Sequence, residues 1–182
     1  QKVFGEVPRD WNDFISASQL VQAEAKKYFI EFWRTGKPYR CGILWWNLRD
    51  GWPILSDAIT DYFFSKKLAY YYIKRVQENA IVAVNDALEV IAVNDTFKPA
   101  EGKVEISDIE GGKVLFEANF KIPPNGKTLV GNVSGLPSER GMLLIKYEID
   151  GKEQLNHYLY GKPPFDLKKY RKWAESLEIK RD

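Results

Sequence analysis

Seven short runs rich in β-branched and aromatic residues recur between residues 80 and 160, and they limit the fold more than any other feature of the chain. Turn-forming pairs such as Asn-Asp, Gly-Gly and Asp-Gly separate them. Asp150-Gly151 predicts a tight hairpin, because both central positions of a type I′ turn need a positive φ. The pattern therefore predicts an antiparallel β-sandwich over residues 78–161. Its expected strands are Ala80–Val84, Leu88–Val93, Lys103–Ile109, Lys113–Ile122, Lys127–Val133, Met142–Ile149 and Gln154–Tyr160.

Seven strands at this spacing are typical of an immunoglobulin-like sandwich. The chain has one cysteine, so the Cys…Trp…Cys signature of antibody domains is absent. The agreement is therefore with the architecture of such domains and not with antibody domains themselves.

The first 77 residues follow a different pattern, that of a helix, a strand and a second helix. Gly36 and Pro38 end the first helix, which is expected over about residues 10–35. The apolar run Cys41–Trp46 predicts a short strand buried on both faces, as in a parallel sheet. The second helix is expected over Lys66–Gln77, and this order of elements is part of an α/β architecture. The first helix is expected from the spacing of Val21, Ala25, Tyr28, Phe29 and Phe32.

Composition divides the chain into three segments. Residues 1–77 hold 17 of the 26 aromatic residues and carry a net charge of +4, whereas residues 78–161 carry −5 and residues 162–182 carry +3. A change of this kind predicts a domain boundary near residue 78. After Pro163-Pro164, a short helix is expected in the tail, with apolar side chains that dock on a neighbouring element. The whole chain is expected to be an α+β arrangement of several parts.

Charge and residue counts exclude several classes of function. A net charge of +2 gives no electrostatic case for nucleic acid or an anionic membrane as partner. No run of about 18 apolar residues and no leader occurs, so a soluble protein is expected and its compartment stays open. One cysteine and one histidine exclude an internal disulfide and any site that needs two imidazoles, so neither a metal nor a cofactor is expected. Cys41 is expected to be buried, and His157 to pack or form a surface hydrogen bond.

The loop after the apolar run is the one constellation suited to chemistry. In parallel α/β folds, the loops that leave the carboxyl ends of the strands form the active site. A sugar needs a flat aromatic face for its C–H side and polar groups for adjacent hydroxyls. Composition alone favours a plainer alternative, in which the tryptophans are core residues and Arg-Asp is a surface ion pair. The candidate substrate-binding residues are Trp46, Asn47, Arg49, Asp50 and Trp52.

These residues also resemble those of a known family. The stretches Gly42–Pro53, Ser56–Tyr62 and Lys66–Tyr71 resemble the end of the catalytic barrel in glycoside hydrolase family 2, especially its β-mannosidase-like branch. Upstream, Phe14–Leu20 with Gln22–Ala25 is similar to the helix before the eighth barrel strand of those enzymes. The sandwich, closing in Asn156–Gly161, is similar to the immunoglobulin-like domain that follows the barrel. The resemblance covers about residues 11–161.

The resemblance implies roles for the loop. The family pattern is close to Trp-Gln-x-Asn-Asp-x-Trp-Pro, in which Asn47 stands where the family usually has Gln, and Arg49 where it usually has Asn. It implies that Trp46 is the aromatic floor of the sugar subsite and that Asp50 and Trp52 shape its wall. Because a guanidinium matches a carboxylate, Arg49 leaves open an acidic or differently configured sugar in place of a mannoside.

The resemblance also implies that the catalytic residues lie elsewhere. Retaining enzymes of this family use two glutamates about 5–5.5 Å apart, and both lie on earlier barrel strands. Glu6 and Glu24 are nearest by position, but neither has the family's context, so no catalytic residue is expected in this chain. The chain is expected to be the C-terminal piece of a retaining glycoside hydrolase, inactive alone. Its expected partners are a carbohydrate substrate and the upstream barrel and sugar-binding domains of the same polypeptide.

A second hypothesis stays open, that of a free-standing sandwich module which binds carbohydrate or a protein partner. In it, the first 77 residues serve as a helical brace. The two hypotheses differ over Ile43–Trp46, which a glycosidase fragment leaves exposed and poorly paired because its barrel neighbours are missing. A module covers that strand within the same chain and presents an exposed aromatic platform on the sandwich.

Overall fold

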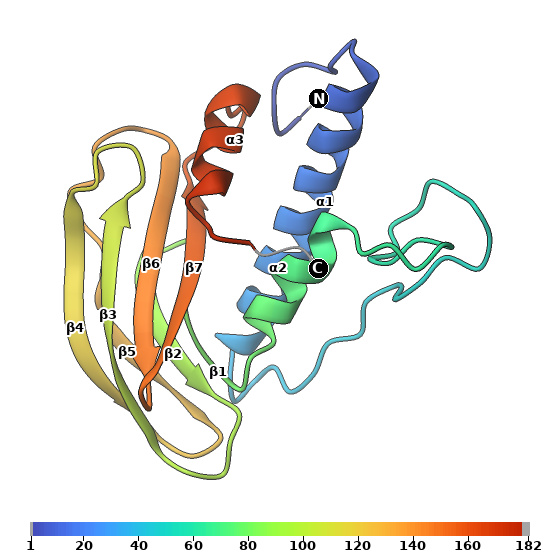
Figure 1. The fold of residues 1–182 in the computed structure, drawn as a ribbon. Coiled ribbons are helices and arrows are strands. Elements are labelled where there is room, and N and C mark those ends of the chain that lie inside the picture. The colour runs from blue at the N-terminus through green and yellow to red at the C-terminus, as the bar shows by residue number, and fades with distance from the viewer. Residues whose placement is uncertain (1, 180–182) are drawn as a thin grey trace.

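The computed structural model describes residues 2–179 and contains three helices and seven strands in that range. The predicted α+β fold class is confirmed. The elements are α1 (Trp11–Arg34), α2 (Leu68–Val76), β1 (Ala80–Val84), β2 (Glu89–Asn94), β3 (Ala100–Asp108), β4 (Val114–Ile122), β5 (Gly126–Asn132), β6 (Gly141–Ile149), β7 (Lys152–Tyr160) and α3 (Leu167–Glu175). A β-sandwich lies on one side, α1 and α2 lie beside it, and α3 lies between the upper parts of the sandwich and α1 (Figure 1).

The sandwich consists of two antiparallel sheets, with strand orders β1-β2-β5 and β4-β3-β6-β7. All seven predicted strands are present, within three residues of the expected ends. In immunoglobulin constant-type domains the fourth strand joins the sheet of the first, second and fifth. Here β4 pairs with β3 instead, along Ala100↔Ile122 to Ser107↔Val114. The core between the sheets is aliphatic at its centre, with Val82, Val90, Val104, Ile106, Leu143 and Ile145 all buried.

The hairpin between β6 and β7 has the predicted turn. Ile149 pairs with Lys152, so Asp150 and Gly151 are its two central residues. Their φ angles are 50° and 80°, both in the left-handed region that a type I′ turn requires. The dipeptide therefore sets the register of the longest strand pair in the sandwich.

Helix α1 packs against α2 and shares a core with it. Asp10 caps its first turn, since the Asp10 side chain accepts a hydrogen bond of 3.0 Å from the Asp13 amide. Leu20 and Ile30 face Ile73 and other buried residues of α2. The sandwich residue Met142 belongs to the same apolar cluster. The helices are thus packed on the sandwich and are not a separate layer.

The predicted tail helix is confirmed as α3, and it docks as expected. Asp166 caps it by accepting a hydrogen bond of 2.9 Å from the Lys169 amide. Tyr170, Trp173 and Leu177 point into the apolar cluster that α1 and α2 form. The C-terminal helix therefore completes a core that begins at residue 4.

The strand expected at Cys41–Trp46 does not form, which corrects the sequence prediction. In the described range, residues 35–67 contain no strand and make only the isolated bridges Arg49↔Thr60 and Thr60↔Lys66. Leu44 is 99% exposed, and Cys41 is exposed as well, so its predicted burial is also wrong. A strand needs neighbouring strands to pair its backbone groups and cover its side chains. No other part of the described chain supplies them.

None of the described helices is long and apolar enough to cross a bilayer.

Candidate functional site

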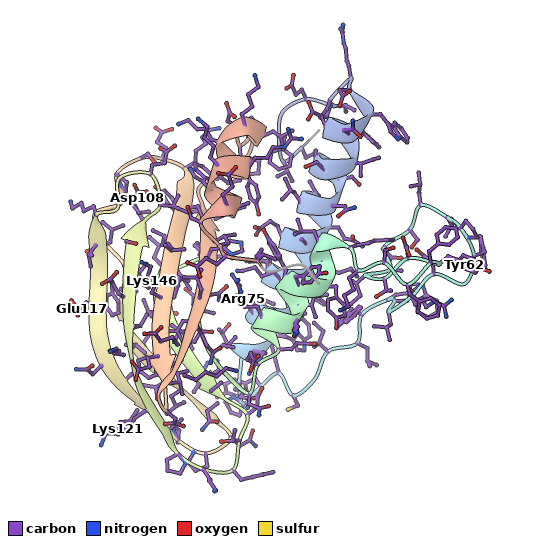
Figure 2. The ribbon with its side chains drawn as sticks, viewed as in Figure 1. Tyr62, Arg75, Asp108, Glu117, Lys121 and Lys146 are labelled. Carbon is purple, nitrogen blue, oxygen red and sulfur yellow. The ribbon has the colours of Figure 1, made fainter. Side chains whose placement is uncertain are left out.

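The candidate loop lies within residues 35–67, the long segment that joins α1 to α2 and is called the excursion below. Figure 2 shows Tyr62 at the tip of this excursion, on the side of the helices away from the sheets. Two short backbone segments run side by side there. The Thr60 amide donates to the Leu48 carbonyl at 3.0 Å, and the Asp50 amide donates to the Thr60 carbonyl at 3.1 Å. This parallel pairing fixes the backbone of residues 47–50 against residues 58–60.

Asp50 is the anchor of the loop. Its side chain is only 2% exposed, and it accepts hydrogen bonds from the Ser56 hydroxyl and, at 3.2 Å, from the Lys67 ammonium. The Ser56 hydrogen bond, aided by Lys67, lowers the pKa of Asp50 below its usual value. Both carboxylate oxygens therefore have protein partners, so Asp50 shapes the loop and does not present a free group to a ligand.

The two tryptophans of the loop present their rings to the exterior. The exposed fraction is 76% for Trp46 and 64% for Trp52. The Trp46 carbonyl is held by Lys26 of α1, whose ammonium donates to it at 2.9 Å. The Trp46–Asn47 peptide bond is cis. The Asn47 side-chain oxygen is buried and has no hydrogen-bond partner among residues 2–179.

Arg49 lies on the opposite side of the loop from the buried Asp50. Its guanidinium donates to the Tyr62 carbonyl at 3.2 Å and lies 3.6 Å from the centre of the Phe64 ring. Phe64 has a φ of 68°, in the left-handed region that non-glycine residues seldom occupy. Arg49 thus holds an unusual turn, while its side chain remains exposed.

The structure therefore brings the five predicted site residues onto one loop but divides their roles. Trp46 and Trp52 face outward, Arg49 contacts the neighbouring turn, and Asp50 is held inside. Sequence reasoning missed the residues that hold the loop. Lys67 lies 17 positions after its partner and has no local pattern that marks it, and Lys26 lies on a helix that precedes the loop.

The two carboxylates that stand nearest to the expected catalytic positions are not paired with each other. Glu6 is exposed in the N-terminal turns. Glu24, on α1, accepts a hydrogen bond of 2.6 Å from His157 Nε2 on β7 and another from the Tyr170 hydroxyl on α3. Among the described residues, no group of three or more histidine, cysteine, aspartate or glutamate side chains is placed to hold a metal ion.

His157 is buried and lies edge-on against the Tyr72 ring, so the packing expected for it is confirmed, and its hydrogen bond to Glu24 is not at the surface. Burial lowers the pKa of His157, and the adjacent Glu24 carboxylate only partly opposes this. For Glu24, burial acts to raise the pKa, but His157, Lys27 and Tyr170 outweigh it, so the pKa is lowered. His157 Nδ1 has no partner in the described chain. A neutral ring with its proton on Nε2 leaves only a lone pair unmatched there, so we assign that tautomer.

The stability of the protein is therefore expected to fall as the pH drops from 7.5 to 5.5. Because the pKa of His157 is lower in the folded chain, the unfolded chain takes up this proton first as the pH falls through about 6.5, which costs up to about 1.4 kcal/mol at pH 5.5. The depressed pKa of Glu24 adds a further loss below about pH 4.5. Denaturant unfolding at several pH values measures the change. In the His157→Gln variant, the loss of stability between pH 7.5 and 5.5 should disappear. An unchanged pH profile in that variant would contradict the lowered pKa of His157.

Curated proteins and solved structures that are similar to this chain include β-mannosidases. No family model matches the chain. Among curated proteins, β-mannosidase B of Aspergillus niger is 34% identical over an alignment 144 positions long, which covers 65% of this chain and 17% of that protein. For β-mannosidase B of Aspergillus fumigatus the identity is 28% over an alignment 185 positions long, which covers 95% of this chain and 21% of that protein. The chain thus spans about a fifth of the length of these relatives.

Solved structures agree with the sequence relatives. The β-D-mannosidase from Dictyoglomus thermophilum is 30% identical, with a TM-score of 0.74 over 88% of this chain and 21% of that one. The exo-chitosanase from Amycolatopsis orientalis, at 21% identity and a TM-score of 0.71, shares the fold over 94% of this chain. By sequence and by fold, the chain therefore corresponds to the C-terminal portion of glycoside hydrolase family 2 proteins, the family of the β-mannosidases that it matches.

Proposed function

We propose that the chain is the C-terminal portion of a retaining glycoside hydrolase that cleaves O-glycosidic bonds, with β-mannosides as the first substrates to test. In this proposal the chain supplies part of the sugar-binding subsite and an accessory β-sandwich. The catalytic glutamates come from an upstream barrel of the same polypeptide. Residues 1–77 are the end of that barrel, residues 78–161 the sandwich and residues 162–182 the tail.

The observation that carries this proposal is the uneven distribution of exposed apolar side chains. Of the 20 large apolar side chains that are exposed in the described range, 17 lie between Val7 and Phe64. The sandwich exposes three, Phe97, Val114 and Leu129. Soluble proteins seldom leave so large an apolar face uncovered, and such a face marks a contact with another surface. An upstream barrel would cover it and would pair the extended segment at residues 41–46.

The same distribution disfavours the free-standing module. That hypothesis expects Ile43–Trp46 to be covered within the chain and an aromatic platform to lie exposed on the sandwich. Leu44 and Trp46 are instead exposed, although Ile43 and Trp45 are half-buried against the helical core. Of the three exposed apolar side chains of the sandwich, only Phe97 is aromatic.

The proposed subsite rests on the loop geometry. Trp46 offers a flat face suited to the C–H side of a pyranose ring. Its carbonyl accepts the hydrogen bond from Lys26, and the residues that follow it, Asn47 and Leu48, accept hydrogen bonds from the amides of Ile59 and Thr60. Trp52 is exposed in the same loop, and the exposed Arg49 adds a cation to the loop. These are the features by which a sugar site binds and orients its ligand.

Hydrolysis of aryl glycosides by two forms of the protein tests the proposal. The complete gene product that contains this chain is expected to hydrolyse p-nitrophenyl β-D-mannoside or another aryl glycoside from a panel. Residues 1–182 alone are expected to show no turnover. Turnover by residues 1–182 that disappears when Glu6 or Glu24 is replaced by glutamine would overturn the proposal, as would a reading frame without an upstream barrel.

A further inference from the structure

Helix α1 has two polar faces that bond to different parts of the molecule. Side chains at positions i, i+3 and i+7 of a helix lie on one face, and those about half a turn away lie on the other. Gln19, Gln22 and Lys26 form the first of these faces. The second is formed by Glu24, Tyr28, Glu31 and Arg34.

The first face holds the excursion that carries the candidate site. The Lys26 ammonium donates to the Trp46 carbonyl at 2.9 Å and lies 5.0 Å from the centre of the Trp45 ring. Gln22 Nε2 donates to the Asp57 carbonyl at 2.7 Å. Gln19 accepts a hydrogen bond of 3.2 Å from the Leu68 amide, where α2 begins. Three side chains of one helix thus bond to the excursion at Trp46 and Asp57 and to the start of α2 at Leu68.

The second face holds the sandwich, through several independent contacts. The Tyr28 hydroxyl donates to Asp86 at 2.7 Å, in the β1–β2 turn. The amide of Asn156 on β7 donates to Glu31 at 2.6 Å, and the guanidinium of Arg34 donates to Asp95 at 2.6 Å. Since these contacts extend over about two turns of the helix, α1 cannot rotate or slide on the sandwich without breaking several of them.

We propose that Lys26 and Gln22 are positioning residues for the candidate sugar-binding loop, and that through α1 the sandwich fixes the orientation of Trp46. This inference rests on the proposed function of that loop. It gives the sandwich a role in the reaction although no sandwich residue lies in the loop.

The physical basis is the small number of bonds that the excursion makes. Residues 41–46 pair with no strand, so the backbone around Trp46 gains no order from a sheet. A hydrogen bond from a charged donor is worth more than one between neutral groups. Lys26 and Gln22 are therefore the contacts whose loss should loosen the loop while the core stays intact.

Amide hydrogen exchange in the 182-residue chain tests the positioning role directly. The Lys26→Met variant keeps the hydrocarbon stem and loses the donor. We expect it to speed exchange of the Ile59 and Thr60 amides, which bond to Asn47 and Leu48, about tenfold. Sandwich amides such as that of Ile145 should be unchanged. Lys26→Arg should restore slow exchange, and Lys74→Met, on an exposed position of α2, is the matched control.

Equal exchange in Lys26→Met and the unmodified chain would overturn the positioning role. A second measurement, on the complete gene product, separates this failure from failure of the proposed function. There, Lys26→Met should lower kcat/KM about tenfold through both kcat and KM, and Lys26→Arg should recover most of it. If Trp46→Ala leaves kcat/KM unchanged while Lys26→Met still speeds exchange, the proposed function fails. If Trp46→Ala lowers kcat/KM while Lys26→Met does not, the inference fails.

Discussion

Replacement of Trp46 by alanine in the complete gene product is expected to lower kcat/KM for an aryl glycoside about a hundredfold. A sugar that covers about 100 Å² of the indole face gains about 2.5 kcal/mol from that contact, which corresponds to nearly two orders of magnitude. The folded state should lose little in the isolated chain, because the Trp46 side chain is largely exposed there. Steady-state kinetics and the unfolding midpoint measure the two effects.

The control for this experiment is Phe97→Ala, which removes an exposed aromatic ring from the sandwich. It should leave kcat/KM within a factor of two. Equal kcat/KM in the Trp46→Ala variant and the unmodified enzyme would remove the loop from the substrate site.

The replacement of Glu31 by alanine is expected to lower the free energy of unfolding by about 3–5 kcal/mol. Glu31 pairs with Lys27 at 2.7 Å, and the two side chains are only 5% and 3% exposed. Without Glu31, the buried Lys27 ammonium would lose the carboxylate to which it is bonded, and Asn156 would lose one of its two acceptors. Denaturant unfolding of the 182-residue chain measures the loss.

Two further variants identify the cause of that loss. Lys27→Met combined with Glu31→Leu removes both charges and fills their space, so it should cost much less than Glu31→Ala alone. Glu148→Ala breaks the exposed pair with Lys103 and should cost less than about 1 kcal/mol. If the double variant is as unstable as Glu31→Ala, the buried charge is not the cause.

The strands could be predicted from the sequence because the signals that set them are local. Asp150-Gly151 determines its own turn, and the alternating burial along β5 and the second half of β6 follows the side-chain period of two. The place of β4 in the sandwich could not be predicted in this way. Which sheet an edge strand joins depends on distant partners, here β3.

The error at Cys41–Trp46 has the same origin. An apolar run predicts burial, but in the described chain only Ile43 and Trp45 pack partly against the helical core, and no neighbouring strand covers Leu44 and Trp46. The candidate site was found because its five residues are contiguous. The Lys26 contact that holds it could not be found in this way, since Lys26 and Trp46 are 20 positions apart. The same is true of the buried contact between Glu24 and His157, which are 133 positions apart. Without an alignment of related sequences, no pattern joins such pairs.

The apolar cluster shared by the helices and the sandwich limits how this region can be exchanged in evolution. Phe4 and Leu20 meet Met142 and Tyr170 in one core, so the residues on either side of position 78 depend on each other for burial. A recombination event at that position would join two half-cores that did not evolve together. Modules that move freely between proteins have their cores within their own limits. The helical segment, the sandwich and the tail are therefore expected to be inherited as one block.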